Sequence, residues 1–178
     1  MLTSRPMLEF RRRRSLLGAL VGFAALVVLG CGGSNFDGHV FREGDLAFRV
    51  GPIPAAWRSI DADGALLAFR DDRDEATVAL NGRCGLDGDD VPLESLTHHL
   101  FLHFTDVTLL KQERFELAGR AALRSELTAA LDGVPMHYVV VVLKKNGCVY
   151  DFMLVNAEGK RPDQRAFEGF VGGFETLG

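Results

Sequence analysis

Hydrophobic and polar residues alternate in short runs along most of the chain after residue 40. Such alternation, bounded by Gly, Pro or Asp, is the pattern of β-strands that have one buried face. Asp-Gly at 132–133 and Asn-Gly at 146–147 supply the positive φ angles that two-residue hairpin turns require. The predicted strands cover residues 45–50, 65–70, 76–83, 107–117, 120–130, 134–145 and 148–156.

Two segments follow a helical period instead. The apolar residues of the first recur at spacings of three and four, which predicts a helix over residues 92–104 with Pro92 in its first turn. Those of the second form one apolar stripe on a helix that starts at Pro162. The two stripes consist of Leu93, Leu96, Leu100 and Phe104, and of Phe167, Phe170, Val171 and Phe174.

The strand over residues 134–145 indicates how the elements are layered. Both of its faces are mainly apolar, which predicts that it is covered on both sides. The neighbouring strand over 120–130 alternates, so one of its faces is expected to meet solvent. We therefore predict an α+β fold, an antiparallel sheet of about six to seven strands with one helix on each face, in the order βββ-α-ββββ-α.

The first thirty residues have the layout of an export signal. Four arginines, Arg11–Arg14, precede an apolar run over residues 16–30 that is shorter than the roughly 20 residues of a membrane-spanning helix. The run ends in Val28-Leu29-Gly30-Cys31, which resembles the lipobox of bacterial lipoproteins. In that family the Cys is acylated and becomes the first residue of the mature chain.

The lipobox resemblance implies a domain organisation. Residues 1–30 would be a signal peptide, and Cys31 would carry the lipid, such as palmitate. Residues 31–40 would be a flexible tether, followed by a single domain over 41–178. An uncleaved signal anchor, with Cys31 as a bystander, is the alternative.

The same segment bears on location. We expect a protein of the bacterial cell envelope that is held to the membrane through the lipid on Cys31 and faces the periplasm. Gly32 after the Cys is similar to the sorting signal of enterobacterial outer-membrane lipoproteins, which favours that membrane. Arg13-Arg14 followed by Ser15 and two leucines suits both twin-arginine and general export, so the pathway stays open.

Two cysteines remain if Cys31 carries the lipid. In the oxidising periplasm, Cys84 and Cys148 predict a disulfide that closes a loop of about 64 residues. Two buried thiols that never meet are the alternative. Neither Cys has a second Cys or His at ligand spacing, which argues against a metal site there.

Composition and charge exclude some classes of partner. The 178 residues are 47% hydrophobic and 25% charged, as in an ordinary globular domain. Beyond residue 30 the chain carries 15 Lys and Arg against 23 Asp and Glu, a net charge of −8. An acidic body lacks the basic stripe that nucleic-acid binding requires, so we expect no nucleic-acid partner.

Two features are candidates for chemistry. His98, His99 and His103 cluster in the first predicted helix, and the last two share a face at a spacing that suits two ligands of one metal. Asp151 lies in an apolar strand, where burial would raise its pKa. Histidines beside an apolar stripe more often pack or hydrogen-bond, and a lone Asp is not an active site. We therefore expect no catalytic residue, no metal and no cofactor.

A short motif near the start of the domain resembles a known superfamily. Phe48-Arg49-Val50, followed by Pro54 and Trp57, looks like the opening of the Mog1/PsbP/DcrB-like proteins, and the resemblance spans residues 41–175. It implies an antiparallel sheet between helices. Members include a partner of a small GTPase, a photosystem subunit and envelope lipoproteins, so the resemblance implies a fold without a shared activity.

These observations favour a non-catalytic lipoprotein that serves as a binding or accessory module of the envelope, with an unidentified protein partner. The alternative is a carrier of a small ligand or lipid, accessory to a transporter, which would need an apolar cavity between the sheet and a helix. A metal-dependent hydrolase that uses the three histidines is the third hypothesis.

Overall fold

The structure is a computed structural model that describes residues 35–85, 90–160 and 162–177. The expected signal peptide over 1–30 and the expected lipid site at Cys31 lie outside these residues. The described chain forms two antiparallel sheets and two α-helices. No helix in this part of the chain is both long and apolar enough to span a bilayer.

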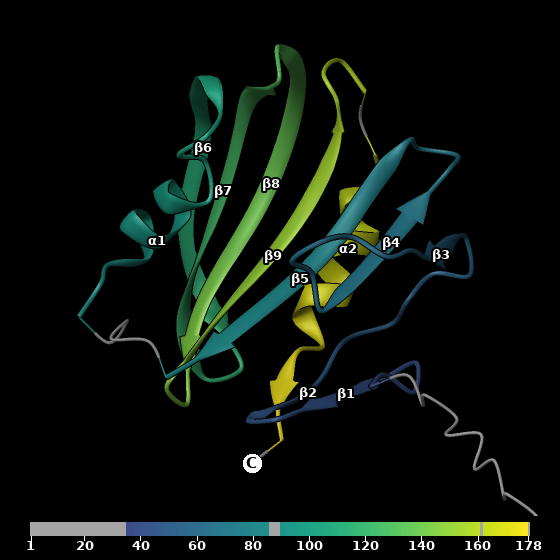
Figure 1. The fold of residues 1–178 in the computed structure, drawn as a ribbon, viewed down its shortest axis with the longest axis vertical. Coiled ribbons are helices and arrows are strands. Elements are labelled where there is room, and N and C mark those ends of the chain that lie inside the picture. Colours follow the sequence, from purple (N-terminus) through teal and green to yellow (C-terminus); the bar gives the residue numbers. More distant parts are fainter. Residues whose placement is uncertain (1–34, 86–89, 161, 178) are drawn as a thin grey trace, which may run out of the picture. The chain divides into compact units, whose positions relative to one another are not determined.

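Seven strands and two helices form the larger part of the domain. The strands are β3 (Trp57–Ser59), β4 (Leu67–Asp71), β5 (Ala76–Cys84), β6 (Thr105–Leu117), β7 (Arg120–Leu131), β8 (Val134–Lys145) and β9 (Cys148–Ala157), and the helices are α1 (Leu93–His99) and α2 (Gln164–Gly172). The strands form one antiparallel sheet in the order β3-β4-β5-β9-β8-β7-β6 (Figure 1). Asp132 and Asn146 adopt positive φ angles of 52° and 54° at the two predicted hairpin turns.

Each face of this sheet is covered by one helix, as predicted. Leu93 and Leu96 of α1 pack over β7 and β8 on one face. Phe167 and Phe170 of α2 pack on the other face (Figure 1). β8 is fully buried over residues 138–143, because it has apolar side chains on both of its faces. The predicted α+β fold with a helix on each face is confirmed.

The residues predicted as the first strand lie in a separate, smaller sheet. Its strands are β1 (Val40–Glu43), β2 (Leu46–Arg49) and β10 (Glu175–Thr176), with β2 in the centre. Phe41 and Phe48 of this sheet are buried in the same cluster as α2. The ring of Phe48 contacts Tyr150 of β9, with centroids 5.9 Å apart. The small sheet and α2 therefore cover one face of the larger sheet together.

β1, β3 and β10 lie outside the strands that the hydrophobic pattern predicts. β3 has three residues and β10 has two, which is too short for an alternating pattern to be recognised. β3 is the seventh strand of the larger sheet in place of the segment over 45–50, since Trp57 pairs with Asp71 of β4. The predicted number of strands in that sheet is thus right, although one strand is assigned to the wrong segment.

The first helix is shorter than the predicted range of 92–104, because it ends at His99. The chain then turns, and Phe101 and Phe104 fold back onto Tyr138 with ring centroids 5.2 and 5.6 Å away. The aromatic residues after the helix thus reach the core from a turn. Their spacing imitates a helical stripe, which explains the wrong boundary.

Within the tether predicted over residues 31–40, the residues from 35 onward contact the domain that was predicted to begin at residue 41. Phe36 packs against the buried core and forms an isolated bridge with Phe41. The backbone N–H of Arg42 donates to the carbonyl oxygen of Asn35 over 2.9 Å. Residues 35–40 are therefore part of the domain, because an aromatic side chain at position 36 is stabilised by burial.

Cys84 and Cys148 are joined by a disulfide, as predicted. They face each other across β5 and β9, with Cα atoms 4.0 Å apart and a sequence separation of 64. A cross-link over a loop of this length stabilises a fold by about 4 kcal/mol in the chain-entropy description. It fastens the boundary between the early strands β3–β5 and the late strands β6–β9.

Two glycines allow α2 to approach the segment that follows β2. A Cβ atom on Gly173 would lie 2.3 Å from the Cα of Gly51, and one on Gly51 would lie 1.9 Å from the carbonyl oxygen of Gly169. The backbone N–H of Gly51 donates to the carbonyl oxygen of Phe170 over 2.9 Å. The two backbones are in direct contact, with no room for a side chain.

Gly173→Ala should lower the free energy of unfolding by about 1–3 kcal/mol or more, since backbone atoms cannot give way to the added methyl group. Gly172→Ala is the matched control, because nothing lies within 4 Å of its added Cβ. That change should be neutral or stabilising by up to about 1 kcal/mol. Urea unfolding followed by circular dichroism compares the two variants, and equal stabilities would contradict the close backbone contact.

Candidate functional site

The two faces of the larger sheet are covered to different extents. α2 and the small sheet share one face. On the other face α1 is the single helix among the described residues, and its seven residues span about 10 Å, whereas the twelve residues of β8 span about 40 Å. The main contacts of α1 are with β8 and β7, so the same face of β9 and β5 lies largely beyond its reach.

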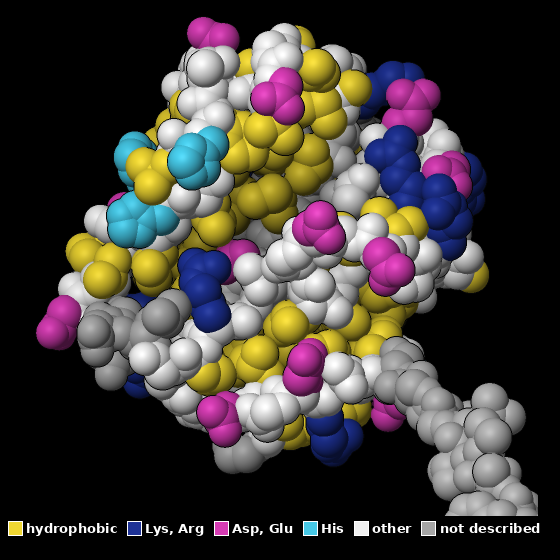
Figure 2. Space-filling view, in the orientation of Figure 1, with side chains coloured by type: hydrophobic (Ala, Val, Ile, Leu, Met, Phe, Trp, Pro, Cys, Tyr) yellow, Lys and Arg dark blue, Asp and Glu magenta, His cyan; other side chains and the backbone are white. Residues whose placement is uncertain are grey.

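The uncovered part of this face is an apolar hollow with a half-buried floor and an exposed rim. The apolar hollow consists of Phe104, Met136, Met153 and Val155 on the floor and Leu102, Leu109, Leu131 and Val134 on the rim. Leu131 and Val134 are 45% and 56% exposed. Figure 2 looks onto this face and shows hydrophobic side chains that continue from one end of the domain down into a depression.

Strand register brings these side chains together. Leu131 faces Val134 across the β7–β8 turn, and Val155 of β9 faces Tyr138 of β8. Side chains two positions apart in a strand share a face, so Val134 and Met136 lie on the same side as Tyr138. Tyr138 belongs to the cluster beneath α1. The rim and the floor are therefore one continuous extension of that core into solvent.

An open apolar surface of this kind suits binding. Covering apolar surface is favourable by about 25 cal/mol per Å², and contiguous exposed apolar patches on folded domains mark interaction sites. Met136 and Met153 on the floor have unbranched, polarisable side chains that adapt to the shape of a partner. None of the side chains of the apolar hollow is a nucleophile, an acid or a base.

The three histidines singled out from the sequence lie on α1 and the turn that follows it. His98, His99 and His103 are all exposed, and Figure 2 shows histidines beside the hydrophobic area. Within the described ranges, no three or more His, Cys, Asp or Glu side chains are grouped so that they could hold a metal ion. The structure therefore does not bring these histidines together with a third ligand.

Asp151 is buried on the same sheet face as the apolar hollow, between Val149 and Met153 of β9. Its side chain is 9% exposed, and Nη1 of Arg83 on β5 lies 3.1 Å from Oδ1 in an ion pair. Oδ1 accepts no hydrogen bond from the described residues. Burial raises the pKa of Asp151, and the charge of Arg83 offsets part of this effect. Arg83 thus compensates only part of the cost of burying this carboxylate.

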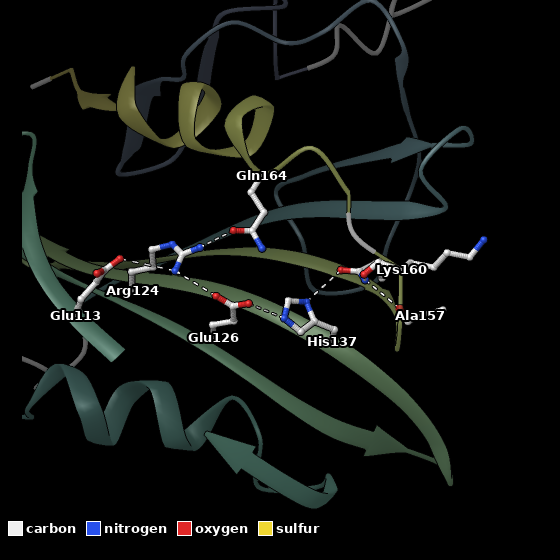
Figure 3. A network of polar contacts seen from close by, with 8 residues as sticks. Glu113, Arg124, Glu126, His137, Ala157, Lys160 and Gln164 are labelled. Atoms are coloured by element: carbon white, nitrogen blue, oxygen red, sulfur yellow. Dashed lines mark hydrogen bonds and ion pairs between the residues drawn. The ribbon is translucent and has the colours of Figure 1, made fainter. Parts of the chain in front are cut away.

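A polar network lies on the opposite face of the sheet, where α2 begins (Figure 3). Arg124 donates to Oε1 of Gln164 over 2.8 Å and lies 3.6 Å from Glu126. The ring of His137 lies between two oxygens, Oε1 of Glu126 at 3.0 Å from Nε2 and Oδ1 of Asn156 at 3.3 Å from Nδ1. A cavity of about 570 Å³ borders Glu126, His137 and Gln164.

This network holds the start of α2 against the sheet. Asn156 is fully buried, and its Nδ2 donates to the carbonyl oxygens of Ala157 and Lys160 over 2.9 and 3.0 Å, which fixes the turn before α2. Because its members bond to one another, the network positions a helix and a turn. The polar face of the strand over 120–130 is predicted to meet solvent, but its side chains are half-buried. The contact between Glu126 and His137 depends on the register of β7 and β8, which the sequence pattern does not give.

Asp151→Asn should change how stability depends on pH. An acid whose pKa is raised by folding binds its proton more tightly in the folded state, so its contribution to stability falls as pH rises above the ordinary pKa of 3.8. The free energy of unfolding of the variant should therefore rise relative to the wild type between about pH 3 and pH 7. Urea unfolding across this range measures the difference, and a difference that stays constant would contradict the raised pKa.

Comparisons with known proteins place this fold. No family model matches the chain, and no curated protein matches it in sequence. The structure of LpqN from Mycobacterium tuberculosis, described as involved in cell envelope biogenesis, has a TM-score of 0.51 and 13% identity over 77% of this chain and 88% of that chain. The solution structure of cyanobacterial PsbP (CyanoP) from Synechocystis has a TM-score of 0.50 and 17% identity over 84% and 99%.

A crystal structure from Bacteroides thetaiotaomicron has a TM-score of 0.53 and 12% identity over 80% of this chain, which spans 50% of that protein. Identities this low establish a shared fold and nothing about activity. The chain therefore has a PsbP-like α+β fold, with the seven-stranded antiparallel sheet and two covering helices that its residues led us to expect.

Proposed function

We propose that this chain is a non-catalytic lipoprotein of the bacterial envelope that binds a protein partner through the apolar hollow. The apolar hollow carries the proposal, because contiguous exposed apolar side chains on a folded domain are stabilised when a second surface covers them. Its floor and rim have no group that could perform acid–base or nucleophilic chemistry. The surface is suited to recognition.

The membrane anchor is part of the same proposal. The lipobox-like motif that ends at Cys31 supports acylation at that residue. The described chain starts at Asn35, and Figure 1 shows β1 near one end of the domain and the β7–β8 turn at the other. A domain attached through its N-terminus would present Leu131 and Val134 at the end remote from the attachment.

The comparisons support an envelope setting without naming a partner. LpqN, which shares the fold, is described as involved in cell envelope biogenesis. From this likeness we take only the cell envelope as the location, and not a partner or an activity. We propose that the domain is held at the outer membrane and faces the periplasm. The residues that would bind its partner are those of its own apolar hollow.

A carrier of a lipid or small ligand would need a cavity that surrounds its cargo. Two cavities of the described chain, of about 620 and 570 Å³, are lined in part by charged side chains. Glu43 and Asp61 belong to the first, and Glu126 and Lys160 to the second. The apolar hollow is open, which favours a protein surface over an enclosed ligand.

Cys31→Ala should abolish acylation and leave residues 1–30 attached, because a lipobox Cys is both the site of the lipid and the site of processing. Intact-mass analysis of the protein isolated from its native envelope measures both effects. Ser34→Ala is the control and should be processed like the wild type. A wild-type protein that keeps residues 1–30 and has no acyl chains would instead establish the uncleaved signal anchor.

A photocrosslinking residue at Val134 should capture one protein in intact cells, because the side chain is 56% exposed at the rim of the apolar hollow. The same residue at Glu168, which is exposed on α2 at the other face of the sheet, is the matched control and should give no adduct. Mass spectrometry identifies the adducts. Absence of a protein adduct at Val134, or equal capture at both sites, would contradict the proposal, and lipid adducts would support the carrier.

A further inference from the structure

The open end of the apolar hollow has acidic charge and no basic charge. Residues 100–110 and 128–138, which form this end, contain no Lys or Arg. Their two acidic residues, Asp106 and Asp132, are exposed and flank the rim. In the neighbouring turn, Lys160 forms an ion pair of 3.5 Å with Glu75. The charged side chains at this end are therefore acidic, whereas Arg70 and Arg83, basic side chains of the same face, lie on β4 and β5 and are paired with Asp72 and Asp151.

The width of the apolar hollow suits one α-helix. Its floor runs along β8 and β9, between α1 on one side and β5 on the other. Neighbouring strands lie about 5 Å apart, so β8 and β5 are separated by about 10 Å. An α-helix with its side chains is about 10–12 Å wide. A second helix beside α1 would complete the cover that α2 and the small sheet provide on the other face.

We propose that the occupant of the apolar hollow is an amphipathic α-helix of a partner protein, with Leu, Phe or similar residues on one side and Lys or Arg at its edges. The apolar side would cover the floor at Met136 and Met153. The basic edges would lie beside Asp106 and Asp132, where opposite charge strengthens and orients binding. This inference rests on the proposed function and specifies the chemistry of its partner.

The same charges disfavour two other occupants. A second copy of this chain would bring Asp106 and Asp132 against identical carboxylates, and like charges at an interface cost free energy. A membrane surface with anionic lipids would also repel them, since attraction to such lipids requires Lys and Arg. The acidic border thus selects a cationic protein segment over both.

A synthetic helix tests the inference on the full lipoprotein held in nanodiscs of zwitterionic phosphatidylcholine, with empty nanodiscs as the blank. The probe is a short, labelled amphipathic peptide of Leu and Lys, compared with its Leu and Glu counterpart by fluorescence anisotropy. The Lys peptide should bind about tenfold more tightly or better, a difference of about 1.4 kcal/mol. Its affinity should fall as salt is added.

Matched variants locate the binding. Val134→Ser should weaken binding of the Lys peptide several-fold, whereas Leu110→Ser should not. Leu110 is equally exposed at 55% but borders the cavity on the α2 face of the sheet. The double variant Asp106→Asn, Asp132→Asn should weaken binding of the Lys peptide and leave binding of the Glu peptide unchanged. Both positions have positive φ, of 54° and 52°, which Asn tolerates, so the backbone is preserved.

Equal affinity for both peptides, or no effect of the Asn variants, would overturn the basic helix as occupant. If Val134 nevertheless captures a protein in cells, the proposed function stands and only the partner's chemistry is wrong. Val134-dependent binding to vesicles of phosphatidylglycerol would assign the surface to a membrane. Val134-dependent dimers in sedimentation would assign it to a second copy. Either result overturns the inference.

Discussion

The structure depends on one strand that must be shielded from water on both of its faces. β8 has apolar side chains on both sides and is fully buried over six consecutive residues, 138–143. One side is closed by α2 and the small sheet, which together bring Phe41, Phe48 and Phe170 onto the strands. The other side is closed only where the seven residues of α1 and the aromatic residues of the turn after it reach. The difference between the two covers produces the apolar hollow.

The two faces also differ in how polar groups are used. On the α2 face, Arg124, Glu126 and His137 are half-buried and bond to one another, so that the beginning of the helix is fixed to β7. On the α1 face, the buried charge is the carboxylate of Asp151 beside Arg83. The first arrangement gives the helix a defined position. The pair of Asp151 and Arg83 lies beside the apolar hollow, whose own side chains are all apolar.

The sequence predicts the long elements and their layering well, because each has a hydrophobic period or a turn signal that acts locally. β8 matches its predicted range of 134–145, and Cys84 meets Cys148 as expected. The end of α1, the strand at Trp57 and the polar network are not predicted, because each depends on distant contacts. Phe104 keeps helical spacing but packs on Tyr138 from a turn, and His137 meets Asn156 only through the register of β8 and β9. The apolar hollow is also not predictable from the sequence, because it is the part of the sheet face that the short helix α1 leaves uncovered.

The pairing of β5 with β9 has a consequence for how the protein is made. One helix and three strands separate β5 from its partner β9 in the chain. The disulfide of Cys84 likewise forms with a cysteine 64 residues later. In a chain that emerges N-terminus first, the edge of β5 that faces β9 would thus stay unpaired until nearly the whole chain has emerged. Such long-range closure slows folding and exposes an unpaired strand in the interval. Folding of this domain would then benefit from a chaperone that covers the unpaired strand, and from an oxidant that joins Cys84 to Cys148 after β9 has emerged.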